Sequence, residues 1–171
     1  VYAAMLWLAL QLRWPVATGR RRRGIVAALL ALVGATIVIG AFVAGLRAGL
    51  AYNTFPLMAG QWVPDGLLTL APAWRNLFEN PTMVQFVHRC LALTTLALIG
   101  FLWLRLARAG LDRGQRRALN ALLAMGLVQV ALGIATLLWQ VPVLLGTLHQ
   151  GGAVLLLSAV LVLAHRGVPA R

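Results

Sequence analysis

The sequence is poor in charged residues and has almost no acidic ones. Only 11% of its 171 residues are charged, and just three of these are acidic, Asp65, Glu79 and Asp112, whereas a soluble domain carries about 25% charged residues. Lysine is absent, so the net charge of +12 comes from arginines, which collect at the ends of apolar segments. This distribution argues against an ordinary soluble domain and against a basic face that binds nucleic acid.

Cysteine is nearly absent as well. Cys90 is the single cysteine, so no disulfide can form within the chain and no redox compartment is indicated. Cys90 lies outside any C-x-x-C-H motif, which excludes covalent haem attachment of that kind. No signal peptide is evident, because residues 1–12 are apolar but short and lack a basic region before them. We interpret residues 1–12 as the end of a truncated transmembrane helix.

Long apolar runs dominate the rest of the sequence. Hydrophobic residues make up 61% of the chain, and residues 24–46 contain no charge. About 20 apolar residues are enough to cross the hydrocarbon core of a bilayer. The sequence therefore predicts an all-α integral membrane protein. We expect a four-helix transmembrane bundle, preceded by the end of the truncated helix, with spans at residues 24–50, 84–104, 119–139 and 143–164.

The connections between these spans predict the orientation in the membrane. The arginine-rich loop 13–23, the loop 105–118 and the tail 165–171 hold 12 of the 15 arginines. The positive-inside rule makes this side cytoplasmic, or the matrix side in a mitochondrion. We expect a multi-pass protein of the cell inner (plasma) membrane with a cytoplasmic C-terminus. The outer loop 51–83 carries four prolines, which favours an ordered, irregular loop.

Two histidines lie at the same expected depth. His88 and His149 each precede an arginine at the inner boundary, Arg105 or Arg166, by 17 residues, and their helices run in the same direction. At 1.5 Å per residue, both are about 25 Å from that boundary. Two imidazoles at one height on separate spans favour bis-histidine ligation of a haem iron. For each histidine alone, a hydrogen-bonded packing role is the alternative.

Other residues of the spans admit more than one interpretation. Arg89 could bind a haem propionate or extend toward the outer headgroups, and Arg47 admits the same two roles. We expect His165, at the inner boundary, to be an interfacial residue. Small residues near the histidines leave space for a porphyrin edge or serve close helix packing. We favour packing for one stripe on the third span, Gly126, Gln129 and Gly133.

Three segments carry a family resemblance. They are GAFVAGLRAGLAYNTFPLMAGQWVP, ENPTMVQFVHR and LGTLHQGGAVLLL. They closely resemble the C-terminal half of haem A synthase in its alphaproteobacterial and mitochondrial form, over nearly the whole chain from residue 24. The resemblance implies an eight-span enzyme built as two similar four-helix halves. That enzyme oxidises the C8 methyl of haem O to the formyl group of haem A for terminal oxidases. The resemblance also implies that His88 and His149 are the axial ligands of a haem b iron.

The resemblance assigns the catalytic glutamate and another histidine pair to the N-terminal half. We therefore expect no catalytic residue here, and an oxidoreductase fragment that is inactive alone. The implied partners are haem O, reached through that half, haem O synthase, oxidase assembly factors and the lipid membrane, while a homo-oligomer is left open. The alternative is a b-type cytochrome, an electron-transfer membrane module without its own substrate. Whether the haem carries electrons or supports the fold is also open.

Overall fold

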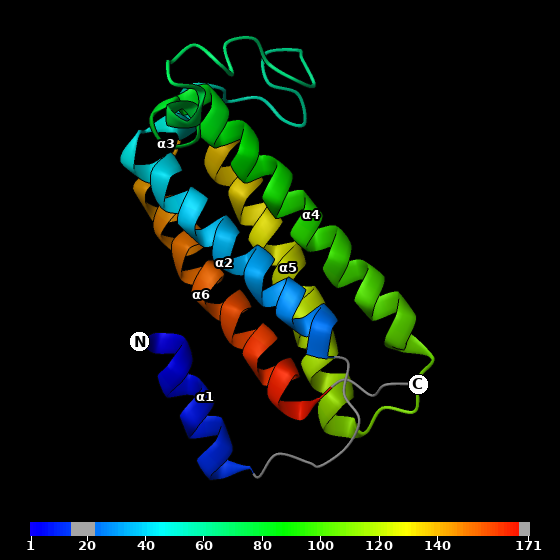
Figure 1. Cartoon of the computed structure of the whole chain (residues 1–171). Helices are drawn as coiled ribbons and strands as arrows, with labels where there is room; N and C mark the ends of the chain where they lie inside the picture. Colours follow the sequence, from blue (N-terminus) through cyan, green and yellow to red (C-terminus); the bar gives the residue numbers. More distant parts are fainter. Residues whose placement is uncertain (15–22, 168–171) are drawn as a thin grey trace.

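The chain folds into a bundle of long helices. The computed structural model describes residues 1–14 and 23–167 (Figure 1). The long helices are α1 (Tyr2–Arg13), α2 (Arg23–Gly45), α4 (Pro81–Ala107), α5 (Arg113–Leu138) and α6 (Val143–Arg166). Short turns of helix, η1 (Ala48–Leu50), η2 (Ala73–Arg75) and α3 (Asn76–Glu79), lie in the long connection between α2 and α4. Within the described residues, the β structure is limited to an isolated bridge between Met58 and Gln61.

Four of these helices, α2, α4, α5 and α6, are long and apolar enough to cross a membrane. The prediction of an all-α membrane bundle is confirmed. Residues 1–12 were expected to end a truncated helix, and α1 does form a helix over Tyr2–Arg13 that packs along α6. The predicted arginine-rich loop and C-terminal tail fall largely on residues 15–22 and 168–171, outside the described part of the chain.

The helices begin and end at residues that complete their backbone hydrogen bonds. α4 starts at Pro81, ahead of the expected residue 84, because the Asn80 side chain accepts from the N–H groups of Thr82 and Met83. α5 starts at Arg113, well before residue 119, because Asp112 and Gln115 form a capping box. Polar caps extend both helices beyond their apolar runs. The prediction from hydrophobicity detected only the apolar part of each helix.

The end of α2 differs from the prediction in the other direction. α2 stops at Gly45, short of the expected residue 50. Arg47 then adopts a left-handed backbone with φ of 51° and starts the separate turn η1. A side chain in that region strains the backbone, and it ends a right-handed helix. The chain leaves the bundle here and enters the long loop.

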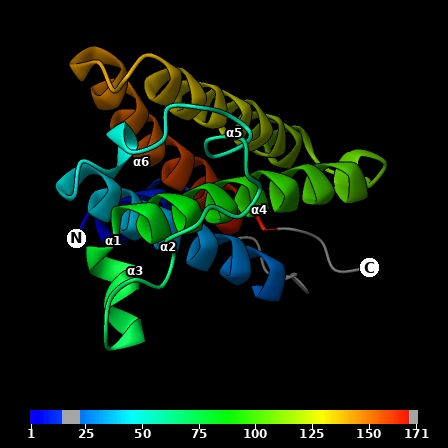
Figure 2. The ribbon, with the colours of Figure 1, turned by 90° about the horizontal axis from the view of Figure 1, so that it is seen from above.

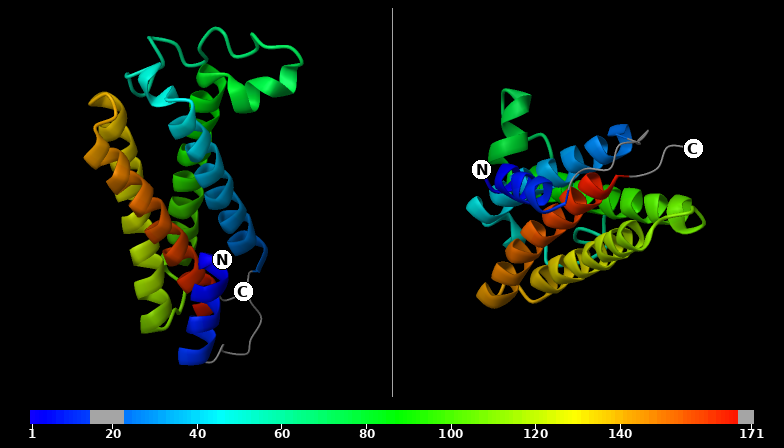
Figure 3. Two further views of the ribbon diagram at one scale, coloured as in Figure 1. Left: turned by 90° about the vertical axis from the view of Figure 1, so that its left-hand side faces the viewer. Right: turned by 90° about the horizontal axis from the view of Figure 1, so that it is seen from below.

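The four long helices form two neighbouring pairs. α2 packs beside α4, and α5 packs beside α6. The short connection between α4 and α5 marks what we call the inner end of the bundle, and the long loop before α4 marks the outer end. Figure 2 shows α4 and α5 close together at their inner connection and further apart toward the outer end. In Figure 3, α1 lies beside the C-terminal part of α6, at the inner end.

A leucine- and valine-rich core fills the inner half of the bundle. All four long helices contribute to it, and several side chains are fully enclosed, among them Leu29, Leu119, Leu122 and Val160. At the inner connection, Arg116 donates to the carbonyls of Ala107 and Ala109 and so caps the end of α4. The inner half is therefore a closed, apolar packing region.

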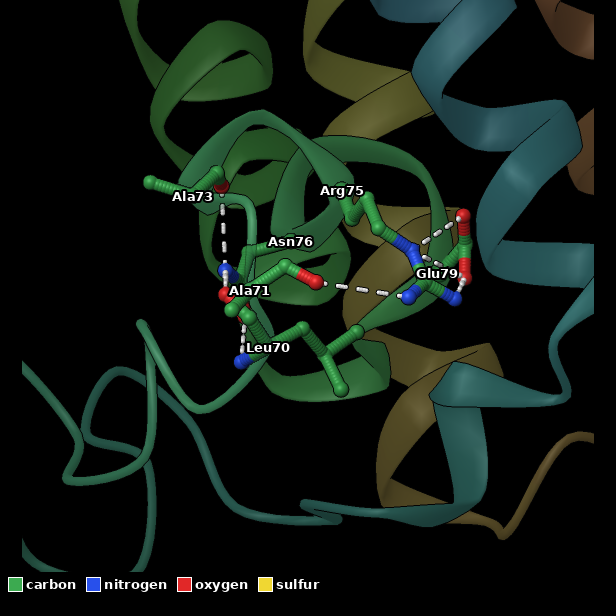
Figure 4. Close-up of polar contacts among 6 residues, drawn as sticks. All are labelled: Leu70, Ala71, Ala73, Arg75, Asn76 and Glu79. Atoms are coloured by element: carbon green, nitrogen blue, oxygen red, sulfur yellow. Dashed lines mark hydrogen bonds and ion pairs between the residues drawn. The ribbon is translucent and has the colours of Figure 1, made fainter.

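The long outer loop is held by buried amides. Asn76 and Asn80 are 0% and 5% exposed. The Asn76 side chain donates to the carbonyls of Leu70 and Ala73, as Figure 4 shows. Asn80 donates to the carbonyls of Gly66 and Leu67 and to the Asn76 Oδ1 atom. The loop is consequently ordered, as the prolines indicated, and it passes over the outer end of the bundle (Figures 1 and 2).

Candidate functional site

His88 of α4 and His149 of α6 face each other in the outer half of the bundle. Their ring centroids are 6.4 Å apart and their planes are nearly perpendicular, at 86°. Both residues are partly buried. The two rings thus meet from separate spans, at the common depth that their distances from the inner arginines indicated.

This separation is wide enough for one metal ion between the rings. Two metal–nitrogen bonds of about 2.0 Å in line, with about 1.1 Å from each nitrogen to its ring centre, place the centroids about 6 Å apart. Among the described residues, no group of three or more histidine, cysteine or acidic side chains could hold a metal ion. A bare ion would need further protein ligands, whereas a metal macrocycle brings four of its own. The donor set therefore fits a macrocycle held from both faces.

The His88 ring packs against a glycine of the neighbouring helix. A Cβ atom at Gly40 of α2 would approach the Cε1 atom of His88 to 3.0 Å. The His88 Nδ1 atom is buried and, among the described residues, has no hydrogen-bond partner. Gly40 thus gives the ring room on the side of α2.

The His149 ring is contacted by two residues of α5. A Cβ atom at Gly133 would come within 2.9 Å of its Cε1 atom. The Gln129 Nε2 atom lies 3.2 Å from His149 Nδ1 and donates to the His149 carbonyl at 2.8 Å. Only Gly126 of the predicted packing stripe meets apolar side chains alone, those of Leu96 and Ile99. For Gln129 and Gly133 the packing interpretation was incomplete, because both contact a histidine.

Arg89 follows His88 on α4, and its guanidinium turns to the outer loop. Nη1 donates to the Thr54 carbonyl at 2.9 Å, and Nη2 donates to the Tyr52 carbonyl at 3.0 Å. Gln85, one turn earlier, also donates to the Tyr52 carbonyl. The Arg89 Nε atom is buried and has no acceptor among the described residues. These contacts explain how a cation is accommodated here, and they fasten the loop beside His88.

The remaining basic candidates lie away from this pair. His165 is 3% exposed and packs edge-on against Trp7 of α1, with ring centroids 5.7 Å apart. Its side chain is covered by α1, and its position at the inner membrane boundary stays a prediction. Arg47 is exposed, at the outer end of α2. Neither side chain contributes to the pair formed by His88 and His149.

Comparison with known families and proteins now defines the relationship. Residues 1–161 match the COX15-CtaA family of cytochrome oxidase assembly proteins. The chain belongs to this family. Membership agrees with the resemblance seen in the three sequence segments.

Individual relatives give the same result. The chain is 46% identical to heme A synthase of Nitrosospira multiformis over 171 residues, which cover 96% of this chain and 48% of the relative. It is 45% identical to the mouse heme A synthase COX15 over 180 residues, which cover 99% of this chain and 43% of the relative. The chain thus spans slightly less than half the length of these relatives. No solved structure matches it.

Proposed function

We propose that this chain is the C-terminal, haem b-binding half of a haem A synthase, with His88 and His149 as the two axial ligands. The observation that carries the proposal is the pair of imidazoles from separate spans at 6.4 Å. Family membership supports it, because relatives that match nearly the whole chain are named heme A synthase. A haem bound there supplies one-electron redox chemistry and a rigid cross-link between helices.

The chain's own residues would hold such a group in defined ways. Gly40 and Gly133 leave space against the two rings, and the Gln129 amide meets His149. We keep Arg89 as a candidate partner of a haem propionate. Its Nη atoms donate to loop carbonyls, but its buried Nε remains available as a donor. The apolar inner core below the rings excludes water from one side of the site.

The complete enzyme would oxidise the C8 methyl of haem O to the formyl group of haem A. No acidic residue of this chain lies within a span: Asp65 is in the outer loop, Glu79 ends α3, and Asp112 caps α5. A carboxylate acid or base within the membrane would therefore come from the other half. The same observation favours one alternative, a b-type cytochrome module without its own substrate. Formation of haem A when this chain is joined to its other half, and its loss in His149→Ala, would support the enzyme over the cytochrome.

We also propose that the inner end of the bundle faces the cytoplasm, in the inner membrane. Eight described arginines lie at or near that end: Arg13, Arg23, Arg105, Arg108, Arg113, Arg116, Arg117 and Arg166. Short loops on the cytoplasmic side of a membrane protein carry an excess of arginine and lysine. Arg20 to Arg22 and Arg171 strengthen the sequence bias but lie outside the described residues.

The direct test is the optical spectrum of the purified chain loaded with haem b. We expect a low-spin, six-coordinate spectrum in both oxidation states, typical of two imidazole ligands. His88→Ala and His149→Ala should each abolish it or convert it to a high-spin form, because one axial ligand is lost. His165→Ala is the matched control and should keep it. Loss of the spectrum in His165→Ala with retention in His88→Ala would overturn the ligand assignment.

A further inference from the structure

One buried side chain beside the histidine pair has a polar atom without a partner. Gln129 of α5 is 9% exposed. Its Nε2 atom donates to the His149 carbonyl and lies 3.2 Å from His149 Nδ1. Its Oε1 atom is buried and accepts no hydrogen bond from the described residues. An unpaired buried carbonyl oxygen costs free energy, so its retention next to a histidine needs a reason.

The backbone of α6 is shaped to admit this amide. A Cβ atom at Gly152 would overlap the Gln129 Oε1 atom. Gly152 lies one helical turn after His149, so the glycine and the histidine share a face of α6. At Gly151 and Gly146, by contrast, a Cβ atom would meet nothing within 4 Å. The space at Gly152 is therefore filled first by the Gln129 amide, with Met125 at ordinary contact distance.

Gln129 and Gly133 act on the ring together. They are four residues apart on α5 and so lie on the same face of that helix. Gly133 meets the ring at Cε1, and Gln129 meets it at Nδ1. His88 has the glycine contact but has no polar side chain at its Nδ1 atom among the described residues. Among the described residues, a side chain within hydrogen-bond distance of Nδ1 is thus found for His149 and not for His88.

We propose that Gln129 is the positioning residue of His149: it fixes the orientation of the imidazole and provides the hydrogen-bond acceptor for its Nδ1–H. The inference rests on the proposed function, in which His149 Nε2 is the metal ligand. An imidazole that binds a metal through Nε2 carries its hydrogen on Nδ1. The Gln129 amide offers both a donor and an acceptor. A half-turn of the amide brings Oε1, the oxygen without a partner, to that hydrogen and gives up the bond from Nε2 to the His149 carbonyl.

This assignment predicts the sign of an electronic effect. A hydrogen bond accepted from Nδ1–H makes the imidazole a more basic ligand, and a more basic ligand stabilises the oxidised metal. Removal of the acceptor should therefore raise the midpoint potential of the bound haem. A residue that merely filled space would leave the potential unchanged.

The first experiment measures the midpoint potential of the full chain loaded with haem b. Gln129→Met keeps the length of the side chain and removes its acceptor. We expect a low-spin spectrum with a potential shifted to more positive values, whereas Gly151→Ala should match the unsubstituted chain. Unchanged potential and unchanged spectrum in Gln129→Met would overturn the positioning role. Failure of the unsubstituted chain to bind haem would instead overturn the proposed function, which separates the two outcomes.

A second experiment tests the contact between Gln129 and Gly152. Gly152→Ala should displace the amide and so shift the potential in the same direction as Gln129→Met. In a Gln129→Ala background, Gly152→Ala should have little further effect, because no amide remains to collide with the new methyl. Additive effects of the two substitutions would show that Gly152 does not make room for Gln129 and would overturn this part of the proposal.

Discussion

The inner and outer halves of the bundle differ in the side chains that they bury. The inner half buries leucine and valine from all four long helices. The outer half holds His88, His149 and Gln129, with glycines against both rings. Apolar side chains pack without directional bonds and give stability, whereas polar groups need partners in fixed places. The inner half therefore holds the helices together, and the outer half brings polar side chains of different helices into contact.

The largest expected effect breaks the inner half. Leu119 of α5 is fully buried, and its replacement by alanine leaves a cavity. Leu119→Ala should lower the free energy of unfolding by about 2–5 kcal/mol, while haem added to the folded fraction keeps its low-spin spectrum. Leu127→Ala is the matched control on the same helix, since Leu127 is 53% exposed. Unfolding in detergent, followed by circular dichroism, measures both. Equal losses of unfolding free energy in the two variants would contradict a stabilising role of the inner core.

Substitution of glycines in the outer half should change the haem spectrum more than the stability. Gly133→Ala and Gly40→Ala place a methyl against His149 and His88, at 2.9 Å and 3.0 Å from Cε1. Crowding costs about 1–3 kcal/mol, and the haem spectrum should change in both variants. We expect the larger change in Gly133→Ala, because Gln129 limits the movement of His149. Gly34→Ala is the control, since its methyl meets nothing within 4 Å. Identical spectra in Gly133→Ala and Gly34→Ala would refute the contact.

Arg89 tests how the outer half is joined to its loop. Arg89→Met removes the donors to the carbonyls of Tyr52 and Thr54. Hydrogen bonds from charged groups contribute about 1.5–3 kcal/mol, so protease cleavage within residues 51–60 should become faster. Arg47→Met is the control, because Arg47 is exposed at the same outer end. Protease should cleave this variant at the original rate. Unchanged cleavage in Arg89→Met would show that the hydrogen bonds from Arg89 do not hold the loop.

The smallest effect concerns the exposed ion pair of the outer loop. The hydrogen bond and charge of Arg75 lower the pKa of Glu79, and Glu79 raises the pKa of Arg75. Because the pKa of Glu79 is lowered in the folded state, the pair stabilises α3 above the ordinary glutamate pKa. That stabilisation is lost as the pH falls through the lowered value. A carboxyl NMR titration should find the low pKa, and Arg75→Met should restore the ordinary one. High salt should weaken the shift.

Several features of the fold could be predicted from the sequence because they depend on local composition. The four spans follow from apolar runs, and the ordered loop follows from its prolines. Helix ends were less predictable. Asp112 and Gln115 carry α5 beyond its apolar run through a capping box, while the left-handed Arg47 ends the first span early. These boundaries depend on single backbone and side-chain geometries, which an apolar pattern does not register.

The candidate site shows the same division. Counting residues from the inner arginines gave His88 and His149 a common depth, because a helix rises by a fixed amount per residue. The same count says nothing of rotation about the helix axis relative to a neighbour. Gln129 was therefore interpreted as packing, although it meets His149 twenty positions away in sequence. The available sequence signal was a polar amide in the middle of an apolar span.

The sequence by itself determined that this chain crosses a membrane, which end carries the arginines, and at what height two imidazoles lie. All of these follow from composition and helical rise along one segment. Tertiary structure decided that the two rings face each other, that Gln129 and Gly133 restrain only one of them, and that α1 buries His165. Such contacts join residues from different helices, so they depend on how the helices rotate and pack, which no single segment encodes.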